Sequence, residues 1–267
     1  MKIIVCMKQI LDPEVPTSKF TLDAEQKAAA RNNTPLVTNI FDEHALEVAL
    51  QLRESVGEGE ITLLSIGPRS AEDVLRKGLA MKADDAVLIA CDNLLELNPL
   101  AVAKVLAVAI KKLDGFDLVL CGRESGDWNS GHVGGMLAEE IGLPYVPFVA
   151  SIEEAGANLR LRAQTDDGWD IVEARRPVLA TITNHESNVP RIRKIRDVIL
   201  ASRREVKTWA ISTLGIDAAA FNQPHTRGDP PFLFIPVKKR TCEFPEQDSP
   251  HEKVSWLCER LGALKTI

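Results

Sequence analysis

The sequence lacks several features that mark specialised classes of protein. No apolar run approaches the roughly 20 residues that span a bilayer, so we expect no membrane insertion. The apolar stretch within Met1–Gln9 is too short for a secretory signal and is typical of a first strand. Positive charge is not in excess either, because the formal net charge is −6. That balance gives no general attraction to nucleic acid or to an anionic membrane.

Metal-binding and nucleophile patterns are also missing. The cysteines are scattered, without CxxC spacing, which predicts reduced thiols in a cytoplasmic compartment and no zinc or iron–sulfur site; they are Cys6, Cys91, Cys121, Cys242 and Cys258. Four histidines share no spacing with one another or with a cysteine and are predicted to be structural: His44, His185, His225 and His251. No Ser–His–Asp or Cys–His arrangement is evident, so we predict no catalytic residue and no metal.

What the sequence does contain is a strand, a glycine-rich turn and a helix between Phe116 and Glu140. Phe116–Cys121 has the apolar run of a buried parallel strand, and Met136, Leu137 and Ile141 have helical spacing. The turn between them carries Gly122, Gly126, Gly131 and Gly134. Such a connection directs free backbone N–H groups and a helix N-terminus at an anion.

Two interpretations of this turn remain open from its residues alone. Neither GxGxxG directly after the strand nor GxxxxGK[ST] is present, so an ordinary capped βα loop competes with a phosphate site. Asn129 and Ser130 are predicted at the N-cap of the helix, where they would also reach a phosphate. His132 would either contact the phosphate or act as a solvated cap.

Alternation of strands and helices predicts the fold. Apolar strands at Lys2–Lys8, Ile61–Ile66 and Ala86–Ala90 are followed by helical patterns, with a capping box at Ser70–Asp73 and an Asn98-Pro99 helix start. This order predicts an α/β, doubly wound, mostly parallel sheet. Phe20–Thr38 is predicted only as a loose hairpin or excursion.

The pattern changes after Pro144. A β-hairpin or meander is predicted around the turn Asp166–Gly168, and Pro177–Thr183 is a further buried strand. We predict an α/β domain over 1–213, which would be nucleotide-binding if the turn is a phosphate site, and, over 214–267, an extended C-terminal arm ending in a helix that docks on a partner. The basic run Pro190–Lys207 lacks interleaved aromatic residues, which favours a partner-docking face over an RNA site.

Several motifs, taken in order, resemble the β subunit of electron transfer flavoprotein. Val5–Asp12 is similar to the end of that family's first strand, and Asn39–Glu43 followed by Ala45-Leu46-Glu47 is similar to its NPFDE…ALE segment. Other similar segments are Ser65–Pro68, Gly78–Asp84, and Asp166–Gly168 with Pro177–Thr181. The resemblance covers nearly the whole chain as far as the C-terminal arm.

The resemblance implies an adenine-nucleotide α-hydrolase-like fold and a cytoplasmic heterodimer, in the mitochondrial matrix if the source is eukaryotic. The α subunit would carry most of an FAD site, and this chain would bind AMP or, in electron-bifurcating members, a second FAD. Phe41 would lie near the flavin dimethylbenzene edge. The implied cofactor-binding residues are Cys6, Asn39, Ile40, Phe41, Asp42, Ile66, Gly122, Arg123, Glu124, Ser125, Gly126, Asp127, Trp128, Asn129, Ser130, Gly131, His132 and Val133.

The resemblance also implies a recognition loop that docks on dehydrogenases, here Arg193, Ile195 and Arg196. This loop lacks the family's leucine-proline pair, which indicates an uncommon dehydrogenase donor; the acceptor would be a quinone reductase or a similar protein.

Other positions depart from the family pattern. Pro13 stands where some AMP-binding members have a tyrosine beside the flavin, which favours the two-flavin type. Ile40 replaces a proline and Asp170 a glutamate, and Gly126–Asn129 keeps only Asp127 of the usual turn.

The predicted function is therefore electron carriage through FAD rather than substrate chemistry. The competing hypothesis is a stand-alone adenine-nucleotide-binding signalling module, which would share the sheet and the turn but has no need for a long C-terminal arm.

Overall fold

The computed structural model describes residues 1–16, 19, 21–23, 28–30, 34–92, 98–216, 234–235, 242–246 and 248–264. The chain divides into two units, Met1–Leu233 and Phe234–Ile267. The strands are β1 Lys2–Cys6, β2 Gln9–Leu11, β3 Leu22–Asp23, β4 Ala28–Ala29, β5 Leu36–Thr38, β6 Glu60–Gly67, β7 Asp85–Ala90, β8 Leu118–Gly122, β9 Tyr145–Ala155, β10 Asn158–Thr165, β11 Gly168–Arg175, β12 Val178–Ile182 and β13 Lys207–Ala210. The α-helices are α1 Ile40–Val56, α2 Glu72–Ala80, α3 Pro99–Leu113, α4 Val133–Ile141, α5 Ile195–Ser202 and α6 Pro250–Ala263.

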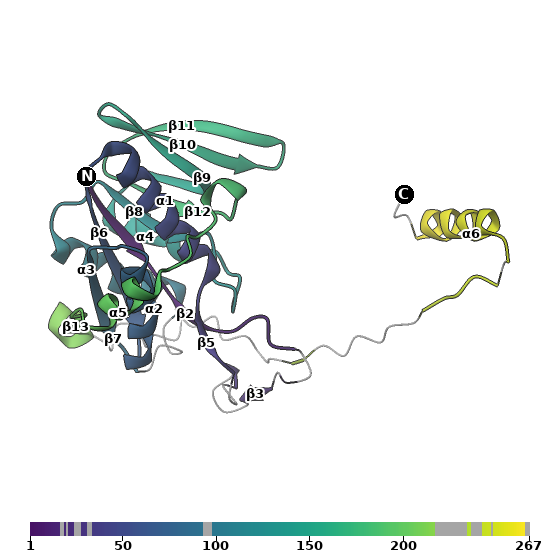
Figure 1. Cartoon of the computed structure of the whole chain (residues 1–267), viewed down its shortest axis with the longest axis horizontal. Coiled ribbons are helices and arrows are strands. Elements are labelled where there is room, and N and C mark those ends of the chain that lie inside the picture. The colour runs from purple at the N-terminus through teal and green to yellow at the C-terminus, as the bar shows by residue number, and fades with distance from the viewer. Residues whose placement is uncertain are drawn as a thin grey trace. The chain divides into compact units, whose positions relative to one another are not determined.

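Among the described residues of the first unit, a nine-stranded sheet has the order β11-β10-β9-β12-β8-β1-β6-β7-β13 (Figure 1). Strands β9, β12, β8, β1, β6, β7 and β13 pair in parallel, and β9, β10 and β11 pair antiparallel. The sheet confirms the predicted doubly wound, mostly parallel fold. The antiparallel strands confirm the meander, with Thr165 opposite Gly168 at its turn.

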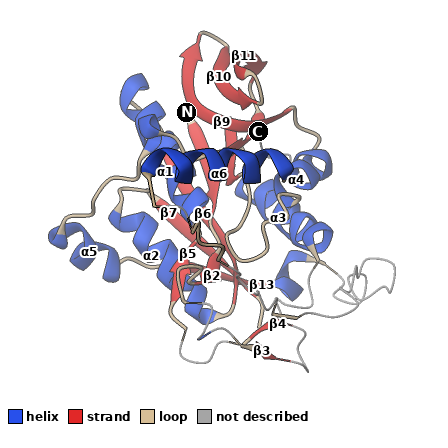
Figure 2. Cartoon of the chain, turned by 90° about the vertical axis from the view of Figure 1, so that its right-hand side faces the viewer, coloured by secondary structure: helices blue, strands red, loops and turns tan. Residues whose placement is uncertain are grey.

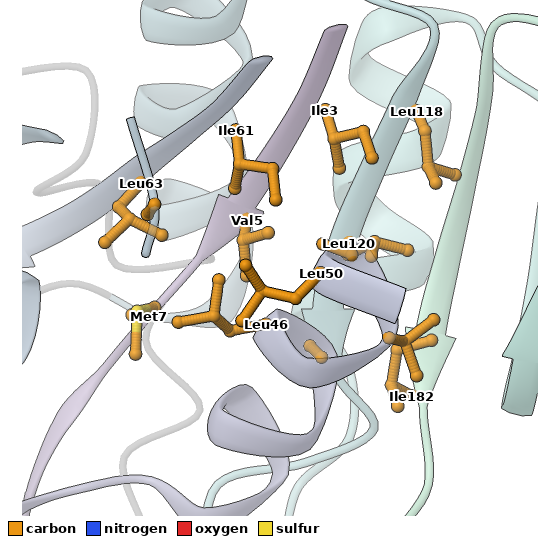
Figure 3. Packing of buried hydrophobic residues seen from close by; sticks show 14 of the residues in the cluster. Ile3, Val5, Met7, Leu46, Leu50, Ile61, Leu63, Leu118, Leu120 and Ile182 are labelled. Atoms are coloured by element: carbon orange, nitrogen blue, oxygen red, sulfur yellow. The ribbon is translucent and has the colours of Figure 1, made fainter. Parts of the chain in front are cut away.

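Helices cover both faces of this sheet (Figure 2). α1 and α2 pack with one face, where Leu46 and Leu50 of α1 lie against Val5 of β1 and Leu120 of β8 (Figure 3). α3 and α4 pack with the other face, against residues such as Ile4 and Val119. Burying each such aliphatic side chain contributes about 1.5–3 kcal/mol. The strands are therefore apolar on both faces, which is why the sequence shows them as continuous runs.

The order of strands reverses beside β1. The chain runs from β1 to β6 and β7 on one side, then returns to β8 on the other. The connection after β1 leads to α1 on one face, whereas the connection after β8 leads to α4 on the opposite face. Ligands of open α/β sheets bind at such a switch point, at the carboxyl ends of the strands.

Local features of the helices and strands differ in places from the prediction. The predicted capping box at Ser70–Asp73 is wrong, because the Ser70 hydroxyl donates to Gln9 Oε1 (2.8 Å) and α2 has no side-chain cap. The Asn98 cap is confirmed, with Oδ1 accepting from the Ala101 N–H at 2.8 Å. Strand β13, paired in parallel with β7, was not predicted.

The excursion after β1 is described in part. β2 pairs antiparallel with β5, and β3 with β4. In the second unit, helix α6 begins after Ser249, whose hydroxyl accepts from the Glu252 N–H. Much of the arm predicted between Leu214 and Ser249 lies outside the described residues.

Candidate functional site

The candidate site lies at the carboxyl ends of β1, β6 and β8, where the strand order reverses. Cys6 and Ile66 are buried at the ends of β1 and β6, and Gly122 ends β8. Cys121 precedes that glycine, and its hydrogen bond with the Cys6 thiol, together with burial, raises the pKa of the Cys121 thiol. Cys121 is therefore protonated and inert as a nucleophile.

Asp42, in the first turn of α1, links the two central strands. Its Oδ2 accepts from the Lys8 N–H at 2.7 Å, and its Oδ1 accepts from the Gly122 N–H at 2.9 Å. Burial raises the pKa of Asp42 to about 7, although these N–H donors and the nearby Lys8 charge oppose the shift. Both carboxylate oxygens therefore accept hydrogen bonds from within the protein, and they hold the ends of β1 and β8 in place.

Asn39 holds the turn that follows β8. Its side chain is buried, and its Nδ2 donates to the Glu124 carbonyl at 2.8 Å. Its Oδ1 accepts from the Gly126 N–H at 3.2 Å. The residue before α1 therefore fixes the backbone of the turn by hydrogen bonds in both directions.

Two glycines permit close approach of helices to the strands. A Cβ at Gly122 would lie 2.4 Å from Asp42 Oδ1 and 2.7 Å from Phe41 Cβ. A Cβ at Gly134 would lie 2.3 Å from Thr181 Cγ2, where α4 starts beside β12. Both contacts are shorter than a side chain tolerates. Packing within the protein therefore explains why both positions are glycine, and no ligand is needed for that explanation.

Lys8 reaches the turn from the other side. Its Nζ lies 2.8 Å from Asp127 Oδ2 and 3.2 Å from Ser125 Oγ. Within the turn, the Asn129 N–H donates to the Ser125 carbonyl at 2.8 Å, and Asn129 adopts a left-handed φ of 50°. The predicted site residues did not include Lys8, although a basic residue close after the apolar run of a central strand was a signal in the sequence.

Backbone N–H groups are free after this turn. α4 begins at Val133 with His132 as its N-cap and no side-chain cap, so the predicted capping by Asn129 or Ser130 is wrong. In the part of the chain that the structure describes, the N–H groups from Ser130 to Gly135 have no hydrogen-bond acceptor. Free amides at a helix N-terminus, with the helix dipole behind them, favour an anion.

Arg123 and Phe41 form a separate contact beside the turn. The Arg123 guanidinium lies 4.8 Å from the centre of the Phe41 ring. The same guanidinium forms an ion pair with Glu124 at 2.9 Å and donates to Thr183 Oγ1 at 3.3 Å. Trp128 is 50% exposed, and Asn129, Ser130, Gly131 and His132 are also exposed.

The predicted docking residues lie on the segment that leads into α5 and at the start of that helix. Ile195 is 81% exposed at the start of α5, and Arg193 and Arg196 are also exposed. Val189 and Ile192 lie on the same segment and are exposed as well, but the prediction did not include them. In the sequence these apolar residues alternate with basic residues, and this pattern could have identified them. We call Val189, Ile192 and Ile195 the apolar docking patch.

Arg191 anchors this segment to α1. Its guanidinium pairs with Glu47 at 2.9 Å and with Glu54 at 2.6 Å, which raises the pKa of Arg191 and lowers that of Glu54. Asn188 is fully buried and donates to the carbonyls of Ala150 (2.8 Å) and Thr183 (3.0 Å). A pocket of about 270 Å³ lies beside the anchor, lined by residues that include Lys77, Ile192 and Arg193.

Two histidines have the predicted structural roles. His44 is buried, with Nδ1 2.7 Å from Asn188 Oδ1, and His185 caps a short 3₁₀ helix by accepting from the Ser187 N–H. His225 lies outside the described residues. Among the described residues, no group of three or more metal-ligating side chains is placed to hold a metal ion. None of the described helices has the length and apolar character needed to cross a membrane.

These features define a doubly wound α/β protein whose connection after β8 presents free backbone N–H groups at the switch point. The family model for the electron transfer flavoprotein domain matches residues 27–214. The chain is 34% identical to electron transfer flavoprotein subunit beta of Megasphaera elsdenii, over 100% of both chains. It is 36% identical to the protein of that name in Clostridium acetobutylicum, over 82% of both chains. It is also similar to the Caffeyl-CoA reductase-Etf complex subunit CarD of Acetobacterium woodii, at 30% identity over 82% of both chains.

This chain belongs to the electron transfer flavoprotein family, as a member of its β-subunit group. The relatives of Megasphaera elsdenii and Clostridium acetobutylicum are both named as electron transfer flavoprotein subunits, which supports a role in electron transfer. The family assignment confirms the resemblance identified from the sequence.

Proposed function

We propose that this chain pairs with an electron transfer flavoprotein α subunit and binds an adenine nucleotide at the turn after β8. The observation that carries the proposal is the series of N–H groups from Ser130 to Gly135, which have no acceptor among the described residues. These groups would donate to the nucleotide phosphates. Cys6, Ile66 and the segment from Asn39 to Asp42 would form the sides of the site, and Gly122 to Val133 its phosphate-binding edge.

FAD shared with the α subunit would supply the redox chemistry. The residues of this chain would bind and orient the nucleotide and exclude water from the flavin. None of their side chains would act as nucleophile or general base. Phe41 would face the flavin while Arg123 holds its ring from one side, at 4.8 Å. The C-terminal arm from 214 to 267, with α6, would dock on the α subunit, because Val254 and Leu257 of α6 are exposed within their own unit.

The bound nucleotide is either AMP or a second FAD. Pro13 favours the second FAD, since it stands where some AMP-binding members have a tyrosine. It lies near the turn, 3.6 Å from the position of a Cβ at Gly126. A second FAD would make the complex an electron-bifurcating one that takes electrons from NADH. A relative named as a subunit of a Caffeyl-CoA reductase-Etf complex supports this alternative.

The apolar docking patch would contact dehydrogenases that donate electrons. Ile192 and Ile195 are 96% and 81% exposed, which is unusual for large apolar side chains without a partner. Arg193 and Arg196 beside them would pair with acidic residues of the donor. The acceptor, a quinone reductase or a similar protein, would use the same reduced flavin.

Co-expression with the α subunit tests the proposal. We expect a yellow heterodimer in the cytoplasmic fraction. One flavin and one AMP per heterodimer would identify the AMP type, and two flavins would identify the bifurcating type. A colourless homo-oligomer that binds adenine nucleotide by itself would instead support the signalling module.

A further inference from the structure

The turn after β8 contains two carboxylate side chains, those of Glu124 and Asp127. Backbone N–H groups alone would have to hold a phosphate beside these carboxylates. An anion in this position therefore needs a cationic side chain nearby, because like charges at short range oppose its binding.

Two cationic side chains reach the turn in the described structure, and they differ in how firmly they are held. Arg123 is fixed by the Glu124 carboxylate, by Thr183 and by the Phe41 ring. Lys8 has a partly exposed ion pair with Asp127, in which the side chains are 35% and 21% exposed. Such an ion pair contributes little to stability and is exchanged at small cost.

The backbone of Lys8 is fixed although its side chain is not. Its N–H donates to Asp42 Oδ2 at 2.7 Å, and its carbonyl accepts from the Asn39 N–H at 2.9 Å. The ammonium group thus extends from a rigid point at the end of β1 and touches Ser125 and Asp127 of the turn. The turn itself does not need the ion pair, since Asn39 holds its backbone.

We infer that the Lys8 ammonium group binds the phosphate of the adenine nucleotide, and that it exchanges its ion pair with Asp127 for the phosphate when the nucleotide binds. The inference rests on the proposed function and adds a residue to it. Lys8 adds to the affinity for the phosphate that the backbone N–H groups provide, whereas recognition of adenine and ribose does not depend on it. The shared chemistry is the phosphate of AMP or the pyrophosphate of FAD.

The test uses the co-purified heterodimer after its exchangeable nucleotide has been removed. Equilibrium binding of AMP, FAD and adenosine is measured for the wild type, Lys8→Gln, Lys8→Arg and Asp127→Asn. Lys2→Gln is the matched control, because Lys2 lies at the opposite end of the same strand. Adenosine separates phosphate recognition from the rest of the site, and the ratio of AMP to FAD affinity distinguishes the two phosphate sources.

We expect Lys8→Gln to weaken the binding of AMP or FAD about tenfold or more and to leave adenosine unchanged. Lys8→Arg should restore most of the affinity, and Asp127→Asn should keep or raise it because a competing carboxylate is gone. The affinity of the wild type should also fall more steeply with salt than that of Lys8→Gln.

Equal losses for AMP and adenosine in Lys8→Gln would overturn the inference, as would no loss for either. A loss in Asp127→Asn as large as that in Lys8→Gln would show that the ion pair is only structural. If the wild type itself binds no nucleotide, the proposed function fails. If the wild type binds nucleotide and Lys8→Gln binds it equally well, only the inference about Lys8 fails.

Discussion

Asp42 Oδ1 accepts a hydrogen bond from the Gly122 N–H at 2.9 Å, which joins the first turn of α1 to the end of β8. The other carboxylate oxygen accepts from Lys8, so one buried side chain controls both strands at the switch point. The geometry of the turn after β8 therefore depends on a residue 80 positions away in the sequence.

Gly122→Ala should disrupt this junction. The new Cβ would lie 2.4 Å from Asp42 Oδ1, so the carboxylate or the turn must move. We expect a loss of about 1–3 kcal/mol in the free energy of unfolding, measured with urea, and weaker nucleotide binding. Gly262→Ala in α6 is the control, since nothing lies within 4 Å of its Cβ position. Equal stability of both variants would contradict the prediction.

Asp42→Asn should change how stability depends on pH. The folded-state pKa of Asp42 is raised from 3.8 to about 7, so the unfolded chain ionises first as the pH rises. The wild type should lose stability relative to the variant as the pH rises from about 4 to about 7, by at most about 1.4 kcal/mol per pH unit, with no further loss above. Urea unfolding of both proteins between pH 5 and 8 measures this, and parallel curves would refute it.

Asn188→Ala should destabilise the segment that precedes the docking patch. The side chain is fully buried and donates to Ala150 and Thr183, while its Oδ1 accepts from the His185 N–H at 2.9 Å. Its loss leaves buried polar groups unpaired, at a cost of about 2–4 kcal/mol in urea unfolding. Glu186→Ala, at an exposed neighbour, should be nearly neutral. A neutral Asn188 variant would mean that the segment is held by other contacts.

Ile195→Ala and Ile192→Ala should weaken electron transfer from the dehydrogenase and leave folding unchanged, because both side chains are exposed. Removing an apolar anchor from an interface typically costs about 2 kcal/mol, or roughly thirtyfold in affinity. The measurement is the KM of the donor dehydrogenase for the purified complex. Ile171→Ala on β11, a residue that is 59% exposed, is the matched control. The prediction fails if all three variants behave alike.

The central fold could be predicted because buried parallel strands have continuous apolar sequences. Ile61–Ile66 and Ala86–Ala90 fall within β6 and β7 for this reason. The strand β13 could not be predicted in the same way, since its burial is small and it pairs with β7, which lies more than 100 residues earlier in the sequence.

Long-range contacts also limited the prediction of the candidate site. The Ser70 hydroxyl bonds Gln9 rather than its own helix, so local capping rules gave the wrong result. The burial of Asp42 and the reach of Lys8 depend on the pairing of β1 with β8, which no local pattern specifies. The glycine-rich turn was visible in sequence, but the residues that fix it were not.

Helix α1 connects the junction of the strands with the segment that contains Arg191. Its first turn holds the strand junction through Asp42, and further along it Glu47 and Glu54 hold Arg191 next to the docking patch. With 17 residues it is about 25 Å long and carries both attachments as one rod. A shift of this rod along its axis would displace both attachments together, because one helix carries them.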